Sequence, residues 1–269
     1  MTEFNPAARV LPHPVFHWHL VVSNGEILCT GAGPLHDVLP VWQAGEGEAG
    51  IVSHYLGEWQ GKACGVHHLP IRVDLPGCEW RGLRSLLGVV EEPLFFLAGR
   101  AMQVVNWDLD HQHCGRCGLR TEFHPRDRAR VCSHCNLAVY PRISPCVIML
   151  ITRGDECLLA RHTHHRHSLY TALAGFIEPG ESAEQAVARE AREEVGLDVD
   201  VTRYVGTQSW PFPGQLMIGY LAEARGGILT PDQEEIMEAR WFHRRQIPET
   251  IPPAETLSGQ LIRTFMDMD

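Results

Sequence analysis

Two Cys-x-x-Cys pairs near the middle of the chain constrain its fold more than any other feature. Cys114 and Cys117 form the first pair, Cys132 and Cys135 form the second, and 14 residues separate them. Zinc ribbons use this spacing, because two tight turns then present four thiolates to one tetrahedral zinc ion. The sequence therefore predicts one structural zinc site per chain.

Other readings of the cysteines carry less weight. A redox pair or small buried side chains would explain one Cys-x-x-Cys pair, but two matched pairs favour zinc. Four nearby histidines are rival ligands: His111, His113, His124 and His134. Because four sulfurs already complete a structural site, we expect these histidines to stay outside it. Core packing is predicted for the remaining cysteines: Cys29, Cys64, Cys78, Cys146 and Cys157.

The ribbon divides a chain of 269 residues, which is long enough for more than one core. We expect an N-terminal α/β domain over residues 1–108, the ribbon over 109–141, and a catalytic domain with a C-terminal tail over 142–269. A net charge of -10 argues against broad electrostatic binding to nucleic acid or membranes. The N-terminus lacks the pattern of a secretory signal, and no apolar run reaches membrane-spanning length. A cytoplasmic protein is predicted.

Local patterns predict several elements. Residues 16–30 read as strands broken by Asn-Gly, and residues 92–107 read as helical toward their end. This N-terminal half carries no assignable motif, so we expect it to support the rest. Residues 144–152 read as a buried strand that forms a hairpin with residues 156–161. The histidine-rich run 161–167 is predicted to be a loop without a metal.

A helix is predicted after residue 181. Ser182 and Gln185 form a capping box, Gly196 can end the helix, and an apolar row recurs at helical spacing: Ala183, Ala186, Val187, Ala191 and Val195. Glu190, Glu193 and Glu194 border this buried row. Acids on a helix are usually solvated, and Arg189 and Arg192 offer them local partners.

Carboxylates stacked one turn apart beside a buried stripe repel each other, however, and a hard divalent cation relieves that repulsion. The spacing favours a magnesium or manganese site. Gly175 and Gly180 bracket a loop that lets backbone carbonyls approach the same site.

Residues 175–197 resemble the signature of the Nudix hydrolases at every defined position: Gly175, Glu181, Arg189, Glu190, Ala191, Glu193, Glu194, Gly196 and Leu197. The resemblance implies a Nudix α/β/α sandwich and metal-dependent hydrolysis of a nucleoside diphosphate linked to another group. It names the reaction class but not the substrate.

Residues 207–217, TQSWPFPGQLM, refine the resemblance. A ribbon before the Nudix box and such a segment after it resemble the NADH pyrophosphatase (NudC-like) subfamily, over more than half of the chain. Thr207, Ser209 and Gln215 depart from the subfamily's usual residues, which puts the preference among dinucleotides in question. Prolines fix the backbone, so the segment can hold its shape before a ligand arrives. The alternative that Trp210 and Phe212 are core residues stays open, and both roles are compatible.

The resemblance implies a set of substrate-binding residues: Asp127, Tyr140, Phe176, Gln208, Ser209, Trp210, Pro211, Phe212, Pro213, Gly214, Gln215 and Ser258. Phe176 matches the position that stacks on nicotinamide. Tyr140 matches a position near the dimer interface of the family, which implies a homodimer, although packing is a simpler role for this residue alone.

The resemblance also implies that Glu235 joins Glu190 and Glu194, with the Ala174 carbonyl, as magnesium or manganese ligands. Glu234 and Glu238 are expected to be solvated. Glu193 is the candidate for holding or deprotonating the attacking water, and Glu181 for supporting the loop. The implied products from NADH are nicotinamide mononucleotide and AMP, and the same cut would remove an NAD cap from RNA.

Five ribbon arginines bear on RNA: Arg116, Arg120, Arg126, Arg128 and Arg130. They outnumber Glu122 and Asp127, so the ribbon can steer RNA, although local pairing or a dimer contact explains them equally well. Two rival functions remain. A Nudix enzyme for ADP-ribose or another nucleotide sugar would lack the ribbon and the WPFP segment. A non-catalytic nucleic-acid module would not need the glutamates.

Overall fold

The computed structural model describes residues 4–7, 15–37, 51–163 and 169–268, in two compact units that meet at residues 142 and 143. The first unit contains a six-stranded sheet in the order β1-β4-β5-β2-β3-β6 and a three-stranded sheet β7-β8-β9. Its elements are β1 (Phe4–Pro6), β2 (Trp18–Ser23), β3 (Glu26–Cys29), β4 (Val52–Trp59), β5 (Lys62–His68), β6 (Glu79–Gly82), η1 (Leu83–Leu86), α2 (Glu92–Asp110), β7 (Glu122–Phe123), β8 (Arg130–Cys132) and β9 (Leu137–Val139).

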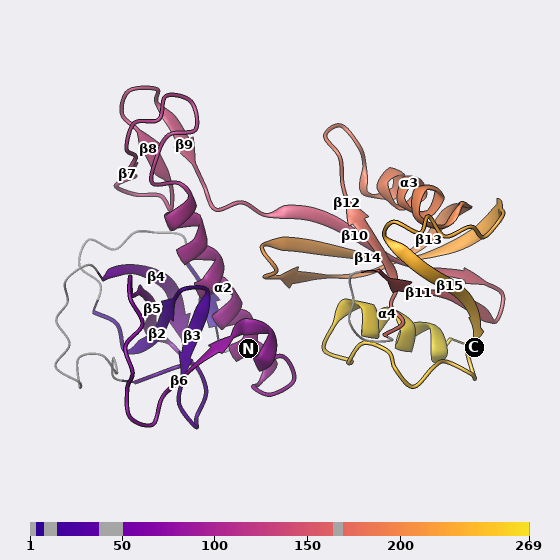
Figure 1. The fold of residues 1–269 in the computed structure, drawn as a ribbon, viewed down its shortest axis with the longest axis horizontal. Helices are drawn as coiled ribbons and strands as arrows, with labels where there is room; N and C mark the ends of the chain where they lie inside the picture. The colour runs from indigo at the N-terminus through magenta and orange to yellow at the C-terminus, as the bar shows by residue number, and fades with distance from the viewer. Residues whose placement is uncertain (1–3, 8–14, 38–50, 164–168, 269) are drawn as a thin grey trace. The chain divides into compact units, whose positions relative to one another are not determined.

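The second unit contains a sheet in the order β13-β14-β10-β11-β15, with β12 paired to β10. Its elements are β10 (Ser144–Arg153), β11 (Glu156–His162), β12 (Leu173–Phe176), α3 (Ala183–Val195), β13 (Leu197–Trp210), β14 (Gln215–Gly227), β15 (Ile236–His243) and α4 (Leu257–Met266). In Figure 1, α3 and α4 lie on opposite sides of this sheet. The predicted α/β/α sandwich is confirmed.

Alternation along β10 builds the two core layers of the sandwich. Val147, Met149 and Ile151 pack with the apolar face of α3, whereas Cys146 and Leu150 pack with α4. Successive side chains of a strand point to opposite faces, so one buried strand serves both layers. This explains why residues 144–152 read as a continuous apolar run rather than an alternating one.

The predictions of a turn at Asn24-Gly25 and of a hairpin after residue 144 are confirmed. Asn24 and Gly25, both with positive φ, form the turn between β2 and β3, and β10 pairs with β11 as a hairpin. Helix α2 continues to Asp110 and packs on the first sheet through a buried face that includes Leu97 and Ala101. Among the described helices, none is both long and apolar enough to cross a membrane. The loop prediction for the run 161–167 is wrong at its start, because Arg161 and His162 belong to β11. Residues 164–167 lie outside the described residues.

The two large sheets share one topology. In the first sheet, β4 and β5 are antiparallel, β5 is parallel to β2, and β3 and β6 follow as antiparallel neighbours. In the second sheet, β13 and β14 are antiparallel, β14 is parallel to β10, and β11 and β15 follow in the same way. Each sheet is followed in the chain by a helix that packs on it, α2 or α4. The first unit therefore repeats the framework of the second, which the sequence patterns did not indicate.

Candidate active site

Helix α3 carries the three glutamates of the candidate site. Ser182 accepts a hydrogen bond from the Gln185 N–H and Gln185 caps the Ser182 N–H in return, while Gly196 ends the helix in the left-handed conformation. These signals fix the helix and its rotation. As a result, Glu194 is 3% exposed as a residue, whereas the side chain of Glu190 is 13% exposed and that of Glu193 is 60% exposed.

Glu194 is the most unusual group in the second unit. Within the described part of the chain, neither of its carboxylate oxygens has a hydrogen-bond partner. Burial, followed by the negative charges of Glu190, Glu235, Asp232 and Glu193, raises the pKa of Glu194 to about 8. A buried, unpaired carboxylate among other acids is costly by itself, so the donor set fits a divalent cation that prefers oxygen ligands.

Gly175 allows Glu190 to reach the sheet. It lies on β12 opposite Val147, and a Cβ built on it would lie 1.9 Å from the carboxyl carbon of Glu190. Glycine is therefore required by the close approach of the carboxylate rather than by backbone conformation. Burial raises the pKa of Glu190 as well, and Arg189 opposes this shift. Ala174 precedes this contact on β12.

Arg189 connects the loop to the helix. Its guanidinium binds both carboxylate oxygens of Glu181 at 2.9 and 3.0 Å and donates to the Phe176 carbonyl at 2.8 Å. It also donates to Glu190 and Glu193, each at 2.8 Å. Glu181 in turn accepts the Glu178 N–H. These contacts agree with a role for Glu181 in supporting the loop, and Arg189 joins that loop to α3.

The loop before β15 brings a further acid to Glu194. Asp232 accepts hydrogen bonds from the backbone N–H groups of Glu234, Glu235 and Ile236 at 2.9 to 3.2 Å. Its own N–H donates to the Glu194 carbonyl at 3.0 Å. Asp232 therefore holds the backbone of Glu235 against the end of α3.

The acids are spaced differently from the ribbon cysteines. Among the described residues, only Cys114, Cys117, Cys132 and Cys135 bring three or more potential ligand atoms within 4.8 Å of one another. The carboxylates lie farther apart, although close enough to raise the pKa of Glu194.

Two matching turns present the cysteine sulfurs. The residue after each pair, Gly118 or Asn136, has positive φ, and its N–H donates to the carbonyl of the first cysteine of its pair. Two backbone N–H groups, of Arg116 and Cys117, lower the pKa of Cys114 to about 7. The neighbouring thiol of Cys117 raises the pKa of Cys135 to about 12. The four thiols lie so close together that they do not all ionise at the same pH. Zinc would bind the four thiolates together, so this arrangement supports a structural zinc site.

Residues 207–217 form the end of the β13–β14 hairpin. Trp210 pairs with Gln215 across it, and Pro211 to Gly214 make the turn. The rings of Trp210 and Phe212 lie 5.1 Å apart in an edge-to-face arrangement. Trp210 also packs partly against the core layer of α4. The stretch is thus a packed turn whose rings are only partly covered.

Strand register places Phe176 and Trp210 on one face of the sheet. Phe176 is opposite Cys146, and Trp210 is opposite Gln215, which is itself beside Ser144. Positions two apart on β10 share a face, here the α4 face. Phe176 is 49% exposed, so its ring is available to a ligand on that side.

Gln208 and Ser258 are buried and hydrogen-bonded within the second unit. Gln208 accepts the Leu257 N–H at 2.8 Å and donates to the Glu255 carbonyl at 2.6 Å. Ser258 accepts the Ala172 N–H at 3.1 Å. These contacts hold the start of α4. They do not support the predicted substrate contacts of Gln208 and Ser258, which stay a prediction. Ser209 is exposed.

The remaining predicted contacts belong to the first unit. Tyr140 is 55% exposed, and Asp127 is an exposed residue whose carboxylate lies 3.4 Å from His124 Nδ1. Two of the five ribbon arginines are not available to RNA. Arg128 donates to the carbonyls of Ala7 and Tyr55, and buried Arg130 is paired with Asp108 at 2.5 Å. Three exposed arginines remain: Arg116, Arg120 and Arg126.

Sequence reasoning missed three features of this region. Asp232 was not singled out, although an acid two residues before a glutamate pair in a loop signals a turn. The helix pattern indicates only intrahelical pairing for Arg189, whereas its guanidinium also reaches Glu181 and the Phe176 carbonyl. The expectation that Glu238 is solvated is wrong, because Tyr170, Arg161 and Arg240 all contact its carboxylate.

Comparison with known proteins covers nearly the whole chain. Residues 142–265 match the NUDIX domain, residues 109–140 match the NADH pyrophosphatase zinc ribbon domain, and residues 17–107 match the NADH pyrophosphatase-like rudimentary NUDIX domain. The last match agrees with the repeated sheet topology of the first unit.

Two curated relatives are similar over most of their length. An NAD-capped RNA hydrolase NudC of Stutzerimonas stutzeri is 43% identical over 78% of this chain and 76% of the relative. Another, of Pseudomonas syringae pv. syringae, is 42% identical over 84% of this chain and 81% of the relative. A Nudix hydrolase structure from Nitrosomonas europaea is 22% identical, with a TM-score of 0.49 over 56% of this chain and 88% of that one.

Proposed function

Because this chain belongs to the NudC family of Nudix hydrolases, we propose that it hydrolyses the pyrophosphate bond of NAD(H) to nicotinamide mononucleotide and AMP. The same cut removes an NAD cap from the 5′ end of RNA, because only the adenosine end of the substrate is extended. The observation that carries the proposal is buried, unpaired Glu194, set among acids beside Gly175.

Glu190, Glu194 and Glu235, with the Ala174 carbonyl, are proposed to hold magnesium or manganese. When bound, such a cation supplies charge neutralisation at the pyrophosphate and a more acidic water. Burial of Glu190 and Glu194 limits competing hydration of their carboxylates, and Arg189 fixes Glu190 against β12. Glu193, which is exposed beside the buried pair, is proposed to orient or deprotonate the water that attacks phosphorus in line.

The nicotinamide end of the substrate is proposed to lie on the α4 face of the sheet, and its pyrophosphate at the acids of α3. Phe176 would stack on the nicotinamide, and Trp210 and Phe212 would form an aromatic wall kept in place by Pro211 and Pro213. Gly214 and Gln215 complete this wall. Ser209 neighbours Trp210 on β13 and so points to the other face, and family resemblance alone includes it. Family resemblance alone supports substrate contacts for four further residues: Gln208, Ser258, Asp127 and Tyr140.

The wider assembly is also a proposal. We propose a homodimer, which light scattering of the purified chain would test, and steering of capped RNA by the exposed ribbon arginines. A reducing compartment such as the cytoplasm would keep the ribbon thiols available for zinc.

Product analysis tests the function. NADH, NAD, ADP-ribose and NAD-capped RNA are incubated side by side with magnesium or manganese, and the products are identified by mass spectrometry. We expect metal-dependent release of nicotinamide mononucleotide, lost in Glu194→Gln and retained in the control Glu223→Gln, whose carboxylate is exposed on β14. Efficient cleavage of ADP-ribose with little cleavage of the nicotinamide substrates would instead support a nucleotide-sugar pyrophosphatase.

A further inference from the structure

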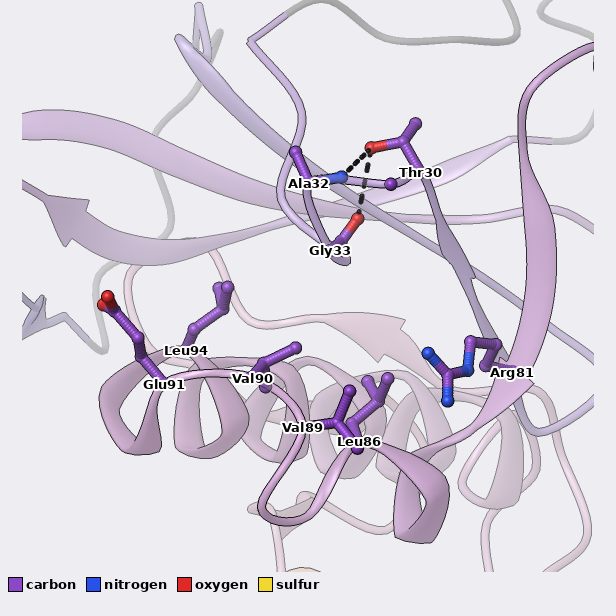
Figure 2. A pocket seen from close by; sticks show the side chains of 10 residues that line it. Thr30, Ala32, Gly33, Arg81, Leu86, Val89, Val90, Glu91 and Leu94 are labelled. Carbon is purple, nitrogen blue, oxygen red and sulfur yellow. Dashed lines mark hydrogen bonds between the residues drawn. The ribbon is translucent and has the colours of Figure 1, made fainter.

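The first unit contains a cleft of about 440 Å³ that none of the proposed chemistry uses. It lies between the turn that follows β3 and the segment running from β6 through η1 to the start of α2. Figure 2 shows the turn of Thr30, Ala32 and Gly33 on one side and the apolar side chains on the other. The volume falls within the range of about 300 to 1,000 Å³ typical of small-ligand pockets.

Aliphatic side chains form the floor of the cleft: Leu86, Val89, Val90 and Leu94. Leu86 is fully buried and anchors the floor, whereas Val89 is 63% exposed at its edge. Gly33, with a φ of +105°, faces this floor, since an added Cβ would lie 3.5 Å from Leu94 and 3.7 Å from Val90. The floor is apolar, which suits the face of a flat ring.

The turn above the floor is rigid and polar. Thr30 and Gly33 exchange two backbone hydrogen bonds of 2.9 Å, and the Thr30 hydroxyl accepts the Ala32 N–H. Within the described part of the chain, the N–H of Gly31 makes no hydrogen bond, and no heavy atom lies within 4 Å of the Cβ position of Gly31. The tip of the turn therefore offers a backbone donor at an open rim.

Opposite charges stand at the two ends of the floor. Figure 2 shows Arg81 at one end of the apolar row and Glu91 at the other. Arg81 is only loosely held, with a 3.3 Å hydrogen bond to the Ser85 carbonyl and a 3.7 Å approach to largely exposed Glu79. Glu91 occupies the N-cap position of α2, but its side chain makes no capping hydrogen bond. Both charged groups are available to a ligand.

We propose that this cleft binds a nucleoside monophosphate whose base carries an amino group. Arg81 pairs with the phosphate, the base lies over the aliphatic floor, and Glu91 accepts hydrogen bonds from the amino group. A guanidinium suits the oxygens of a phosphate, and a carboxylate suits N–H donors and repels a carbonyl oxygen. Because none of these residues belongs to the glutamate site of the second unit, the proposal does not depend on the hydrolytic activity.

Methyl NMR of the full chain tests the proposal with a local readout. The methyl signals of Val89, Val90 and Leu94 are followed during titration with AMP, UMP, adenosine and inorganic phosphate, without divalent metal. We expect AMP to shift these signals, with UMP, adenosine and phosphate each binding at least about tenfold more weakly because each lacks at least one of the matched groups. Hydrolysis of NADH is measured separately on the same protein with divalent metal, so failure here and failure of the hydrolysis proposal are distinguishable.

Two substitutions test the proposed roles of Arg81 and Glu91 at the ends of the cleft. Arg81→Leu is expected to weaken AMP binding at least about tenfold, whereas Arg84→Leu, on the neighbouring η1 and outside the lining, should leave it unchanged. Glu91→Gln should reduce the preference for AMP over UMP. The proposal is overturned if AMP causes no shift at millimolar concentration, if Arg81→Leu binds AMP normally, or if UMP or phosphate binds as well as AMP.

Discussion

At the scale of single residues, the contact between Gly175 and Glu190 decides whether the acids can assemble. In Gly175→Ala, the new methyl group would overlap the Glu190 carboxyl group, and the carboxylate would have to leave its position against β12. We expect a loss of about 100-fold in kcat/KM for NADH with a cooperative fold retained, because small displacements in an active site are this costly.

Gly206→Ala is the matched control for this prediction, since Gly206 lies in the same unit and a Cβ there meets no atom within 4 Å. Kinetics and circular dichroism of both variants would be compared. Full activity of Gly175→Ala would show that Glu190 does not need its observed position.

Asp232 provides a second test at this scale, because it organises the loop that carries Glu235. Asp232→Ala removes the acceptor of three backbone hydrogen bonds and should raise the magnesium or manganese concentration needed for half-maximal activity by about tenfold. Asp232→Asn keeps an acceptor oxygen at the same place and should restore most of that loss. If Asn were as impaired as Ala, the charge of Asp232 rather than its hydrogen bonds would be the essential property.

The residues predicted well from sequence are those whose partners are local. Ser182, Gln185 and Gly196 fix the ends of α3 through neighbours a few positions away, so the pattern suffices. Arg189, Asp232 and Glu238 each also have a partner distant in the chain, and only the folded sheet brings these together: the Phe176 carbonyl, the Glu194 carbonyl and Tyr170, respectively. The required absence of a side chain at Gly175 is likewise visible only once Glu190 lies against it.

At the scale of elements, Gln208 joins the β13–β14 hairpin to α4. Gln208→Ala leaves the Leu257 N–H and the Glu255 carbonyl without these partners, so we expect the free energy of unfolding to fall by about 1 to 3 kcal/mol. If these hydrogen bonds are the whole role of Gln208, the KM for NADH stays unchanged. Chemical denaturation and steady-state kinetics of this variant separate the two roles, because a raised KM with unchanged stability would support the substrate contact implied by family resemblance.

Hairpins and helices followed from local patterns, whereas sheet order did not. Asn24-Gly25 and the apolar run of β10 specify their own turn and strand. The parallel pairings β2–β5 and β10–β14 join strands that are distant in sequence, and no periodicity encodes their choice of neighbour. This is why the repeated topology of the first unit became visible only in the structure.

At the scale of the whole molecule, the first unit contains several buried histidines. His67 bridges Ser53 Oγ at 2.8 Å and His19 Nδ1 at 2.9 Å in the sheet, and burial lowers its pKa to about 3. Burial also lowers the pKa of His19, His36 and His68 below the ordinary 6.5. The folded unit therefore keeps these imidazoles neutral under conditions in which the unfolded chain protonates them.

Acid should consequently destabilise the first unit. The stability that depends on neutral His67 is complete above the unfolded pKa of about 6.5 and is lost as the pH falls below it, by up to about 1.4 kcal/mol per pH unit, because the folded pKa of His67 is about 3. The lowered pKa values of His19, His36 and His68 act in the same direction. Hydrogen exchange of the full chain between pH 7.5 and pH 5, corrected for intrinsic rates, should show earlier opening of β2 and β5. His67→Gln cannot take up this proton and should reduce the slope, whereas equal slopes in both proteins would mean that the folded unit does not lower the pKa of His67.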